Sequence, residues 1–228
     1  MHTILTIDTS STNCAVALLF GHVLLERVST GQRQSAQRVL PMISELLLDA
    51  KIQLGDIDLI AVVAGPGSFT GVRIGIGVAQ GLSLSAAIPA VPLSSLALSA
   101  IATVSESPFD KVLVSEKARE GELYFAAYQC SVRQGVELVG REQVALIEDL
   151  DALPENFAGS SWSLAGSGWE RKGEILQHLG CTAAAQPQTP VIDNQLVVRL
   201  ALLRFNCSEG VEAAALRPNY VKEQLDYT

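Results

Sequence analysis

The stretch AGPGSFTGVRIGIG, at residues 64–77, constrains the fold of this chain more than any other feature of its sequence. It follows the apolar run DLIAVV, which is typical of a buried, parallel β-strand. Gly65 and Gly67 flank a proline, and this pattern predicts a tight turn at the end of that strand. Ser68 is a suitable N-cap, so a helix is predicted over residues 68–86. The stretch therefore predicts a strand–turn–helix unit of an α/β protein.

The glycines of this stretch could either bind a phosphate or allow close packing. A helix N-terminus behind glycines can receive an anion, but the Gly-Lys-Ser/Thr sequence of a P-loop is absent. Glycine also continues along the predicted helix, where each one costs roughly 1 kcal/mol relative to alanine. The pairs Gly71/Gly75 and Gly77/Gly81 are each spaced by four residues and share helix faces. We therefore interpret the later glycines as positions at which the helix packs tightly against other helices.

Three strands are predicted before this unit, at residues 3–7, 15–20 and 23–28, and consecutive strands of this kind predict an antiparallel meander. Apolar residues then recur with the 3.6-residue period of a helix over residues 34–51. Because Pro41 lies inside this helix, we expect a kink, or a helix start near the residue before it.

The order of predicted elements restarts after the run SESP, which predicts a domain boundary. The first domain is residues 1–107, to which the C-terminal tail is expected to return, and the second is residues 108–228. Its predicted elements are strands at 111–115, 122–130, 136–144 and 163–168, and helices at 148–153, 173–179 and 194–207. The pattern predicts a duplicated α/β architecture, with two lobes that each hold a mixed β-sheet flanked by helices.

The formal net charge of −8 argues against direct binding of nucleic acid, because duplex affinity comes chiefly from lysine and arginine. The four cysteines are widely spaced, without a CxxC pair, and we interpret them as reduced and mostly buried. The N-terminus has no basic signal-peptide region, and no apolar run reaches the length of a membrane span. A cytoplasmic protein without a membrane segment is expected.

Polar residues at the end of the first predicted strand form a candidate site. Asp8, Thr9 and Ser10 could hold a magnesium–phosphate group, or could instead satisfy the backbone of a turn. Arg119 and Glu122 could form an ion pair or a site, and the sequence leaves their role open. The three histidines are not at metal-ligand spacing. No catalytic residue, metal ligand or tightly bound cofactor is assigned, and nucleotide binding stays open.

The segments ILTIDTSSTNCAVAL, QRVLPMI, GPGSFTGVRIGIGVAQGLSL and AREGELYFAAY resemble the TsaB (YeaZ) family, and together they span nearly the whole chain. This family is related to TsaD and has the actin-like ATPase (ASKHA) superfold. The resemblance implies a non-catalytic partner of TsaD that acts with TsaE in forming N6-threonylcarbamoyladenosine at position 37 of tRNAs reading ANN codons. It also implies that tRNA is met only through the complex.

TsaD-type proteins carry an HxxxH metal pair, and the resemblance places Ser95 and Ser99 at the two histidine positions. Serine cannot replace imidazole as an iron or zinc ligand, so these positions support a non-catalytic role. The alternatives are a stand-alone ATPase or kinase-like protein that uses Asp8 and the glycine turn, and a metalloprotease. The family pattern also differs at Gln34 and Lys117, where histidine and aspartate are frequent.

In the family, the heterodimer contact uses the first two helices. The resemblance therefore implies an interface with TsaD at or near six positions, Val39, Met42, Ile43, Leu46, Gly75 and Val78. The alternative is that these residues form the intramolecular core. In the absence of TsaD, the same surface could join two copies in a C2 homodimer.

Overall fold

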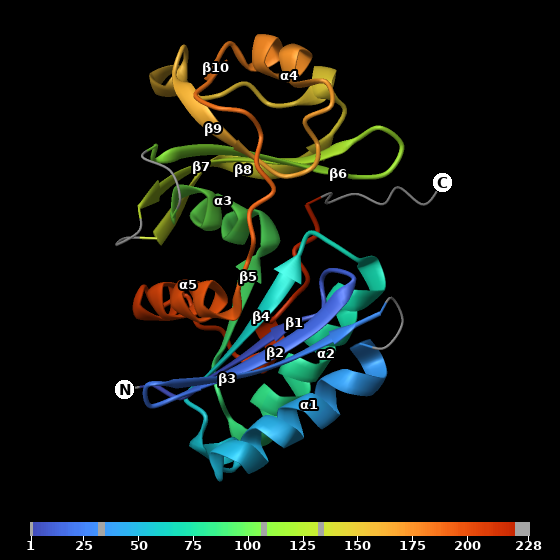
Figure 1. Cartoon of the computed structure of the whole chain (residues 1–228), viewed down its shortest axis with the longest axis vertical. Coiled ribbons are helices and arrows are strands. Elements are labelled where there is room, and N and C mark those ends of the chain that lie inside the picture. The colour runs from blue at the N-terminus through green and yellow to red at the C-terminus, as the bar shows by residue number, and fades with distance from the viewer. Residues whose placement is uncertain (1, 32–34, 106–108, 132–134, 222–228) are drawn as a thin grey trace. The chain divides into compact units, whose positions relative to one another are not determined.

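A computed structural model describes residues 2–31, 35–105, 109–131 and 135–221 of the chain (Figure 1). The chain forms two compact units, and each is continued by a later segment. Unit 1 is Met1–Ser95 with Asp193–Asn219, and unit 2 is Leu96–Ile192 with Tyr220–Thr228. The predicted boundary after residue 107 lies outside the described residues, and the observed division falls earlier, after Ser95.

Unit 1 contains a five-stranded mixed sheet in the order β3-β2-β1-β4-β5. The first three strands form the expected antiparallel meander, and β4 and β5 are added parallel to β1. Every residue of β4 is buried, as expected for a strand covered on both faces. The strands are β1 (Ile4–Asp8), β2 (Asn13–Phe20), β3 (Val23–Thr30), β4 (Leu59–Gly65) and β5 (Ala90–Ser94).

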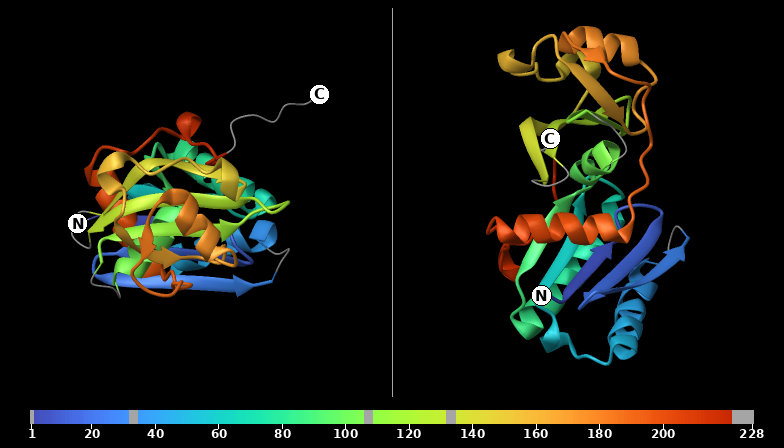
Figure 2. Two further views of the ribbon diagram at one scale, coloured as in Figure 1. Left: turned by 90° about the horizontal axis from the view of Figure 1, so that it is seen from above. Right: turned by 60° about the vertical axis from the view of Figure 1, so that its left-hand side comes forward.

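Helices cover both faces of this sheet (Figures 1 and 2). Helices α1 (Ser35–Ala50) and α2 (Phe69–Ala86) lie on one face, and α5 (Asn194–Asn206) lies on the other. Alternate strand residues such as Leu5 and Ile7 join α1 and α2 in one hydrophobic core. Helix α1 runs unbroken through Pro41, so the expected start near that residue is wrong.

Unit 2 contains a second five-stranded sheet, in the order β10-β9-β6-β7-β8. Its strands are β6 (Lys111–Lys117), β7 (Leu123–Ser131), β8 (Gly135–Ala145), β9 (Ser161–Ala165) and β10 (Thr182–Ala183), and its helices are α3 (Ser95–Ser105, from Leu96 onward) and α4 (Lys172–Leu179). The helix predicted at 148–153 is wrong. Only the 3-10 turn Ile147–Asp149 forms, because the backbone is already extended at Leu150.

The two sheets have the same connectivity. In each unit, an antiparallel meander of three strands is followed by a strand that pairs parallel to the first, and then by another parallel strand. This arrangement confirms the duplicated α/β architecture that the order of elements predicted. No helix among the described residues is long and apolar enough to cross a membrane.

Three of the four cysteines are buried, and Cys207 is exposed. Burial raises the pKa of the Cys130 thiol to about 12 and that of the Cys181 thiol to about 11. These two thiols therefore stay protonated near neutral pH and behave as small apolar side chains.

Candidate functional site

The loop after β1 and the turn after β4 meet at one edge of the unit 1 sheet. Strands β1 and β4 are parallel neighbours, so their carboxyl ends lie side by side. The Ser68 N–H donates a hydrogen bond to the Ser10 carbonyl oxygen over 2.7 Å, and this bond ties the turn to the loop. The Ser68 hydroxyl in turn accepts from the Gly71 N–H and caps α2. The N–H groups of Ser68 and Gly71 are thus both used within the chain.

Thr9 connects the loop to the first turns of α2. Its side chain is fully buried, and its hydroxyl donates to the Gly71 carbonyl oxygen over 2.7 Å. A buried hydroxyl needs such a partner, because leaving it unpaired costs about 1–3 kcal/mol. Thr9 is therefore a packing residue that fixes α2 against β1.

The glycines of the opening motif allow this contact. A Cβ atom on Gly71 would lie 2.0 Å from the Thr9 carbonyl oxygen, and one on Gly67 would lie 2.5 Å from the Ser10 carbonyl oxygen. A Cβ on Gly75 would lie 2.5 Å from the Thr9 hydroxyl oxygen. These three positions accept only glycine without rearrangement of the loop.

We expected these glycines to pack against other helices, and this expectation is wrong. Gly71 and Gly75 approach the loop after β1 and not another helix. Gly77 and Gly81 are exposed, and a Cβ on either would meet nothing within 4 Å. The four glycines thus divide into a buried pair with a steric role and an exposed pair on the outer face of α2.

Asp8 is the remaining polar group of the predicted site. One carboxylate oxygen, Oδ1, accepts hydrogen bonds from the Ser10 N–H over 2.8 Å and from the Ser10 hydroxyl over 2.7 Å. Burial raises the pKa of the Asp8 carboxyl, and the two bonds from Ser10 oppose that shift only in part. Asp8, Thr9 and Ser10 lie together at the end of β1, where the Asp8 carboxylate accepts from Ser10 and the Thr9 hydroxyl donates to Gly71.

The structure places the predicted interface residues mainly in the interior of unit 1. Four of them, Val39, Met42, Ile43 and Leu46, are buried in the core between α1 and the sheet. Gly75 is buried as well, and only Val78 is partly exposed. These buried side chains belong to the intramolecular core, which was the alternative to an interface, because the apolar stripe of α1 faces its own sheet.

A different set of apolar residues forms the outer face of α1 and α2, which contact each other. Leu48 is 76% exposed, Leu84 is 78% exposed and Phe69 is 60% exposed. Leu40 is also exposed, and the guanidinium of Arg73 lies over the Phe69 ring. We call these four apolar residues, together with Gly77 and Gly81, the outer helix face. Leu48 lies off the buried apolar stripe of α1, and its position relative to that stripe can be read from the sequence.

The two serines at the predicted histidine positions lie on α3. The Ser95 hydroxyl donates to the Pro66 carbonyl oxygen over 2.5 Å, so it ties the end of β5 to the glycine turn of the same unit. Ser99 is buried, and its carbonyl oxygen accepts from the Thr103 hydroxyl. Among the described residues, no group of three or more histidine, cysteine, aspartate or glutamate side chains could hold a metal ion.

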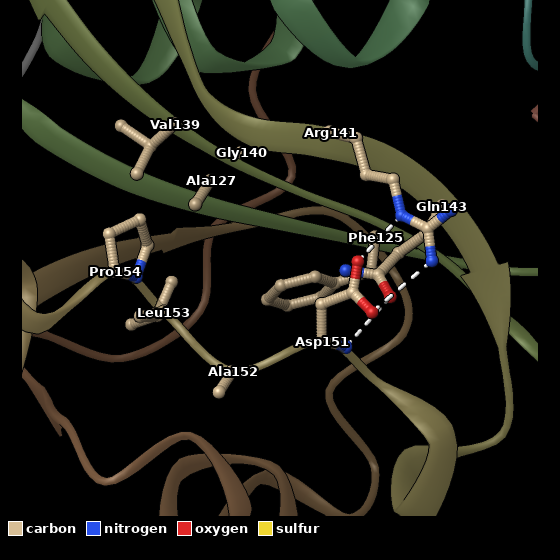
Figure 3. A pocket seen from close by; sticks show the side chains of 10 residues that line it. All are labelled: Phe125, Ala127, Val139, Gly140, Arg141, Gln143, Asp151, Ala152, Leu153 and Pro154. Atoms are coloured by element: carbon tan, nitrogen blue, oxygen red, sulfur yellow. Dashed lines mark hydrogen bonds and ion pairs between the residues drawn. The ribbon is translucent and has the colours of Figure 1, made fainter.

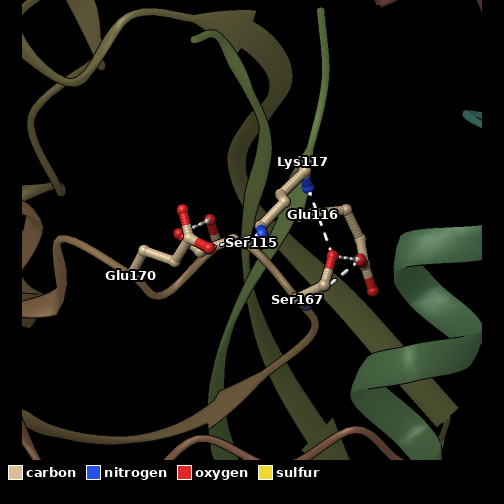
Figure 4. A network of polar contacts seen from close by, with 6 residues as sticks. Ser115, Glu116, Lys117, Ser167 and Glu170 are labelled. Carbon is tan, nitrogen blue, oxygen red and sulfur yellow. Dashed lines mark hydrogen bonds and ion pairs between the residues drawn. The ribbon is translucent and has the colours of Figure 1, made fainter.

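Unit 2 has its own polar network at the corresponding edge of its sheet (Figure 4). The Glu116 carboxylate accepts from the Ser167 hydroxyl and from the Ser167 N–H, and Lys117 pairs with Glu170 at 2.6 Å. Lys117 and Glu170 are both exposed, so this ion pair adds little to stability. The network holds the turn after β9 against the end of β6.

Arg119 and Glu122 lie at the tip of the hairpin between β6 and β7. The Glu122 N–H donates to the Arg119 carbonyl oxygen over 3.0 Å and closes the turn. Glu120 and Gly121, between them, both have positive φ angles, of 57° and 81°. Arg119 and Glu122 thus contribute backbone groups to a tight hairpin turn.

A shallow cavity of about 290 Å³ lies on the unit 2 sheet, between β7, β8 and the segment before Glu155 (Figure 3). Its floor includes Phe125 and Val139, and its rim carries an ion pair between Arg141 and Asp151. The exposed charges of the rim are already paired, so the cavity shows no unsatisfied charge that would select a ligand.

Comparisons with known proteins agree with this architecture. The family model described as "TsaD: tRNA N6-adenosine threonylcarbamoyltransferase" matches residues 23–189. The chain is 37% identical to the tRNA threonylcarbamoyladenosine biosynthesis protein TsaB of Escherichia coli (strain K12), over 97% of this chain and 95% of that protein. It is 40% identical to the protein of the same name from Haemophilus influenzae, over 99% of this chain and 95% of that protein.

Solved structures give the same result. A crystal structure of an uncharacterized protein with similarity to peptidase YEAZ from Pseudomonas aeruginosa is 34% identical, with a TM-score of 0.81 over 97% of this chain and 100% of that chain. A structure of YeaZ from Pseudomonas aeruginosa is 32% identical, with a TM-score of 0.78 over 96% of this chain and 100% of that chain.

Proposed function

The chain belongs to the TsaB (YeaZ) family, and on this premise we propose that it is a non-catalytic partner of a TsaD-type protein. The two proteins, with TsaE, form N6-threonylcarbamoyladenosine at position 37 of tRNAs that read ANN codons. The acidic chain does not hold the tRNA by itself, because it lacks the positive charge that phosphate binding needs. The role implies a cytoplasmic protein.

The observation that carries the proposal is that the loop after β1 is occupied by its own contacts. The Ser10 carbonyl oxygen accepts from Ser68, the Thr9 hydroxyl donates to Gly71, and the Asp8 carboxylate accepts from Ser10. The Thr9 and Ser10 carbonyl oxygens lie so close to Gly71 and Gly67 that a Cβ atom there would clash, so these two glycines face the loop of the chain itself. These contacts favour a packing role for a motif that resembles a phosphate loop.

The serines on α3 support the same proposal. Iron and zinc are not typically bound by the hydroxyl or the backbone carbonyl of a serine. Ser95 is instead engaged by the Pro66 carbonyl oxygen, and Ser99 is buried among apolar neighbours on its helix. Ser95 thus fixes the glycine turn, and Ser99 is a packing position within α3.

The outer helix face is the proposed contact surface for the TsaD-type partner. Three large apolar side chains, Leu48, Phe69 and Leu84, are more than half exposed on two helices that touch each other. Gly77 and Gly81 leave the surface of α2 without side chains, so a partner helix can approach its backbone closely. In the absence of the partner, the same face is proposed to join two copies of this chain.

The test is capture of the TsaD-type partner by the double variant Leu48→Asp/Leu84→Asp. We expect capture to be lost, because two charges would be buried in an apolar interface. The matched control is Val191→Asp, which changes a side chain that is 86% exposed but lies in unit 2. Circular dichroism checks that each variant is folded. Unchanged capture by the double variant would overturn the interface.

Reconstitution of tRNA modification tests the function itself. The partner and TsaE are expected to modify tRNA only when this chain is added, and the purified chain alone is expected to leave ATP intact. Hydrolysis of ATP by the chain alone, abolished by Asp8→Asn, would favour the stand-alone ATPase instead.

A further inference from the structure

The last part of unit 1 is a segment that returns from unit 2 and surrounds one edge of the sheet. Helix α5 packs against β1, β2, β4 and β5, on the face opposite to α2. After α5, the chain passes around the edge strand β5, where Val211 and Ala90 exchange two backbone hydrogen bonds of 2.7 Å and 2.9 Å. The chain then runs along α2. We call residues 211–219 the C-terminal strap.

The strap is fastened to the middle of α2. Its short 3-10 helix, η4 (Ala213–Ala215), contacts α2, and Leu216 is fully buried in the core that also contains Ile76 and Ala79. The Gln80 side-chain amide donates to the Leu216 carbonyl oxygen over 2.9 Å, across 136 positions in sequence. Gln80 thus connects α2 directly to the strap.

The strap is also fastened beside the glycine turn. The Asn219 N–H donates to the Ala64 carbonyl oxygen over 2.8 Å, immediately before Gly65. The strap therefore holds the helix at Gln80 and the strand end that precedes the helix at Ala64. Because the strap is anchored to the end of β4 at Ala64, a shift of α2 along the sheet would pull Gln80 away from Leu216 and break the bond between them.

From these contacts we infer that the C-terminal strap holds α2 in its partner-binding position, with Gln80 as the positioning residue. The inference rests on the proposed function, in which the outer helix face meets the TsaD-type partner. A helix that is already fixed loses less conformational freedom when a partner binds. Where only a fraction of molecules hold the helix correctly, the apparent Kd rises by the inverse of that fraction.

The test compares three substitutions at Gln80. Gln80→Glu has nearly the same shape but has no donor, and its charge repels the Leu216 carbonyl oxygen. Gln80→Ala removes the donor without adding charge, and Gln80→Lys keeps a donor on a longer side chain. The matched control is Ser85→Ala, an exposed position on α2 whose hydroxyl bonds only within the helix.

We expect Gln80→Glu and Gln80→Ala to raise the Kd for the TsaD-type partner several-fold, up to the limit of about ten-fold that losing one good hydrogen bond allows. Amide exchange in α2 should become faster in both variants, while exchange in β6 and β7 of unit 2 stays unchanged. Gln80→Lys should restore most of the affinity, and Ser85→Ala should leave the Kd unchanged. A role confined to overall stability would lower the unfolding midpoint without changing the Kd.

The outcomes separate the two claims. If the unaltered chain does not bind the TsaD-type partner, the proposed function is overturned. If the unaltered chain binds and Gln80→Glu and Gln80→Ala both bind equally well, the inference about the strap is overturned. The exchange measurement needs no partner, so equal protection of α2 in all variants also contradicts the inference.

Discussion

The two units of this chain have one strand order but differ in what they build on it. In unit 1 the sequence Ala-Gly-Pro-Gly, from Ala64, lies at the end of β4, and in unit 2 the sequence Ala-Gly-Ser-Gly, from Ala165, lies at the end of the equivalent strand β9. The first glycine has a φ angle of +100° in one turn and +98° in the other. In both units the turn also donates a backbone hydrogen bond to the end of the first strand or the loop after it.

The difference lies in the helices. Unit 1 carries α1 and α2, of 16 and 18 residues, on one face of its sheet. In unit 2, the helix after the turn is α4, with 8 residues, and the described residues between β8 and β9 form only two 3-10 turns. Exposed leucines on neighbouring long helices are therefore a property of unit 1. The glycine turn is therefore common to both units, whereas the proposed interface is found in unit 1.

The largest expected change in stability comes from a substitution that disrupts the contact between α2 and the loop after β1 in unit 1. Gly71→Ala should lower the free energy of unfolding by about 3 kcal/mol or more, because its Cβ would lie 2.0 Å from the Thr9 carbonyl oxygen. The matched control is Gly77→Ala on the same helix, which meets nothing and should raise the free energy of unfolding by about 1 kcal/mol. Urea denaturation measures both. Equal effects of the two variants would contradict the division into buried and exposed glycines.

The next largest effect is expected at the turn of unit 2, where a substitution tests whether this turn also requires glycine. Gly166→Ala should destabilise unit 2 by about 2–3 kcal/mol, since the position has a positive φ and a Cβ would lie 2.3 Å from the Ser115 carbonyl oxygen. Gly173→Ala, within α4 and in open space, is the control. Native-state amide exchange should show faster opening of β6 and β9 but not of β1 and β4. Loss of protection in both sheets would show that the two units unfold together.

The smallest expected effect is the contribution of the Asp8 carboxyl to the pH dependence of stability. It tests whether the loop after β1 in unit 1 carries a buried charge. Burial raises its folded pKa above the ordinary value of 3.8, so the folded state binds the proton more tightly than the unfolded state. This contribution to stability is therefore fully present below pH 3.8 and is lost as pH rises through the raised folded pKa. Each unit of pKa shift corresponds to about 1.4 kcal/mol.

Asp8→Asn should consequently raise the free energy of unfolding at pH 7 and flatten its dependence on pH between 7 and 4. Ser10→Ala should act in the opposite direction, because its hydroxyl stabilises the charged carboxylate. Denaturation curves across this pH range measure both variants. An Asp8→Asn chain that is less stable than the unaltered chain at pH 7 would contradict a net burial penalty on this carboxylate.

Much of the fold followed from local patterns. The strand–turn–helix unit at residues 64–77, the three-strand meander and the restart of the pattern in the second half were all predicted, because apolar period and glycine turns are local signals. The helix expected at 148–153 failed for the same reason. Its composition suits a helix, but the backbone is already extended at Leu150, and tertiary context decided the conformation.

The candidate site shows where local signals end. The sequence identified the segment Asp8-Thr9-Ser10 and the glycine turn separately, as polar and glycine-rich stretches that follow predicted strands. Their meeting at one edge follows from the parallel pairing of β1 with β4, which no local pattern specifies. That Gly71 and Gly75 lie against the loop after β1, while Gly77 and Gly81 face outward, became known from the three-dimensional contacts. A glycine pattern specifies that something approaches, but the neighbour that approaches depends on contacts distant in sequence. The same holds for Val39 and Leu46, because an apolar stripe is equally suited to the core of its own unit and to a partner.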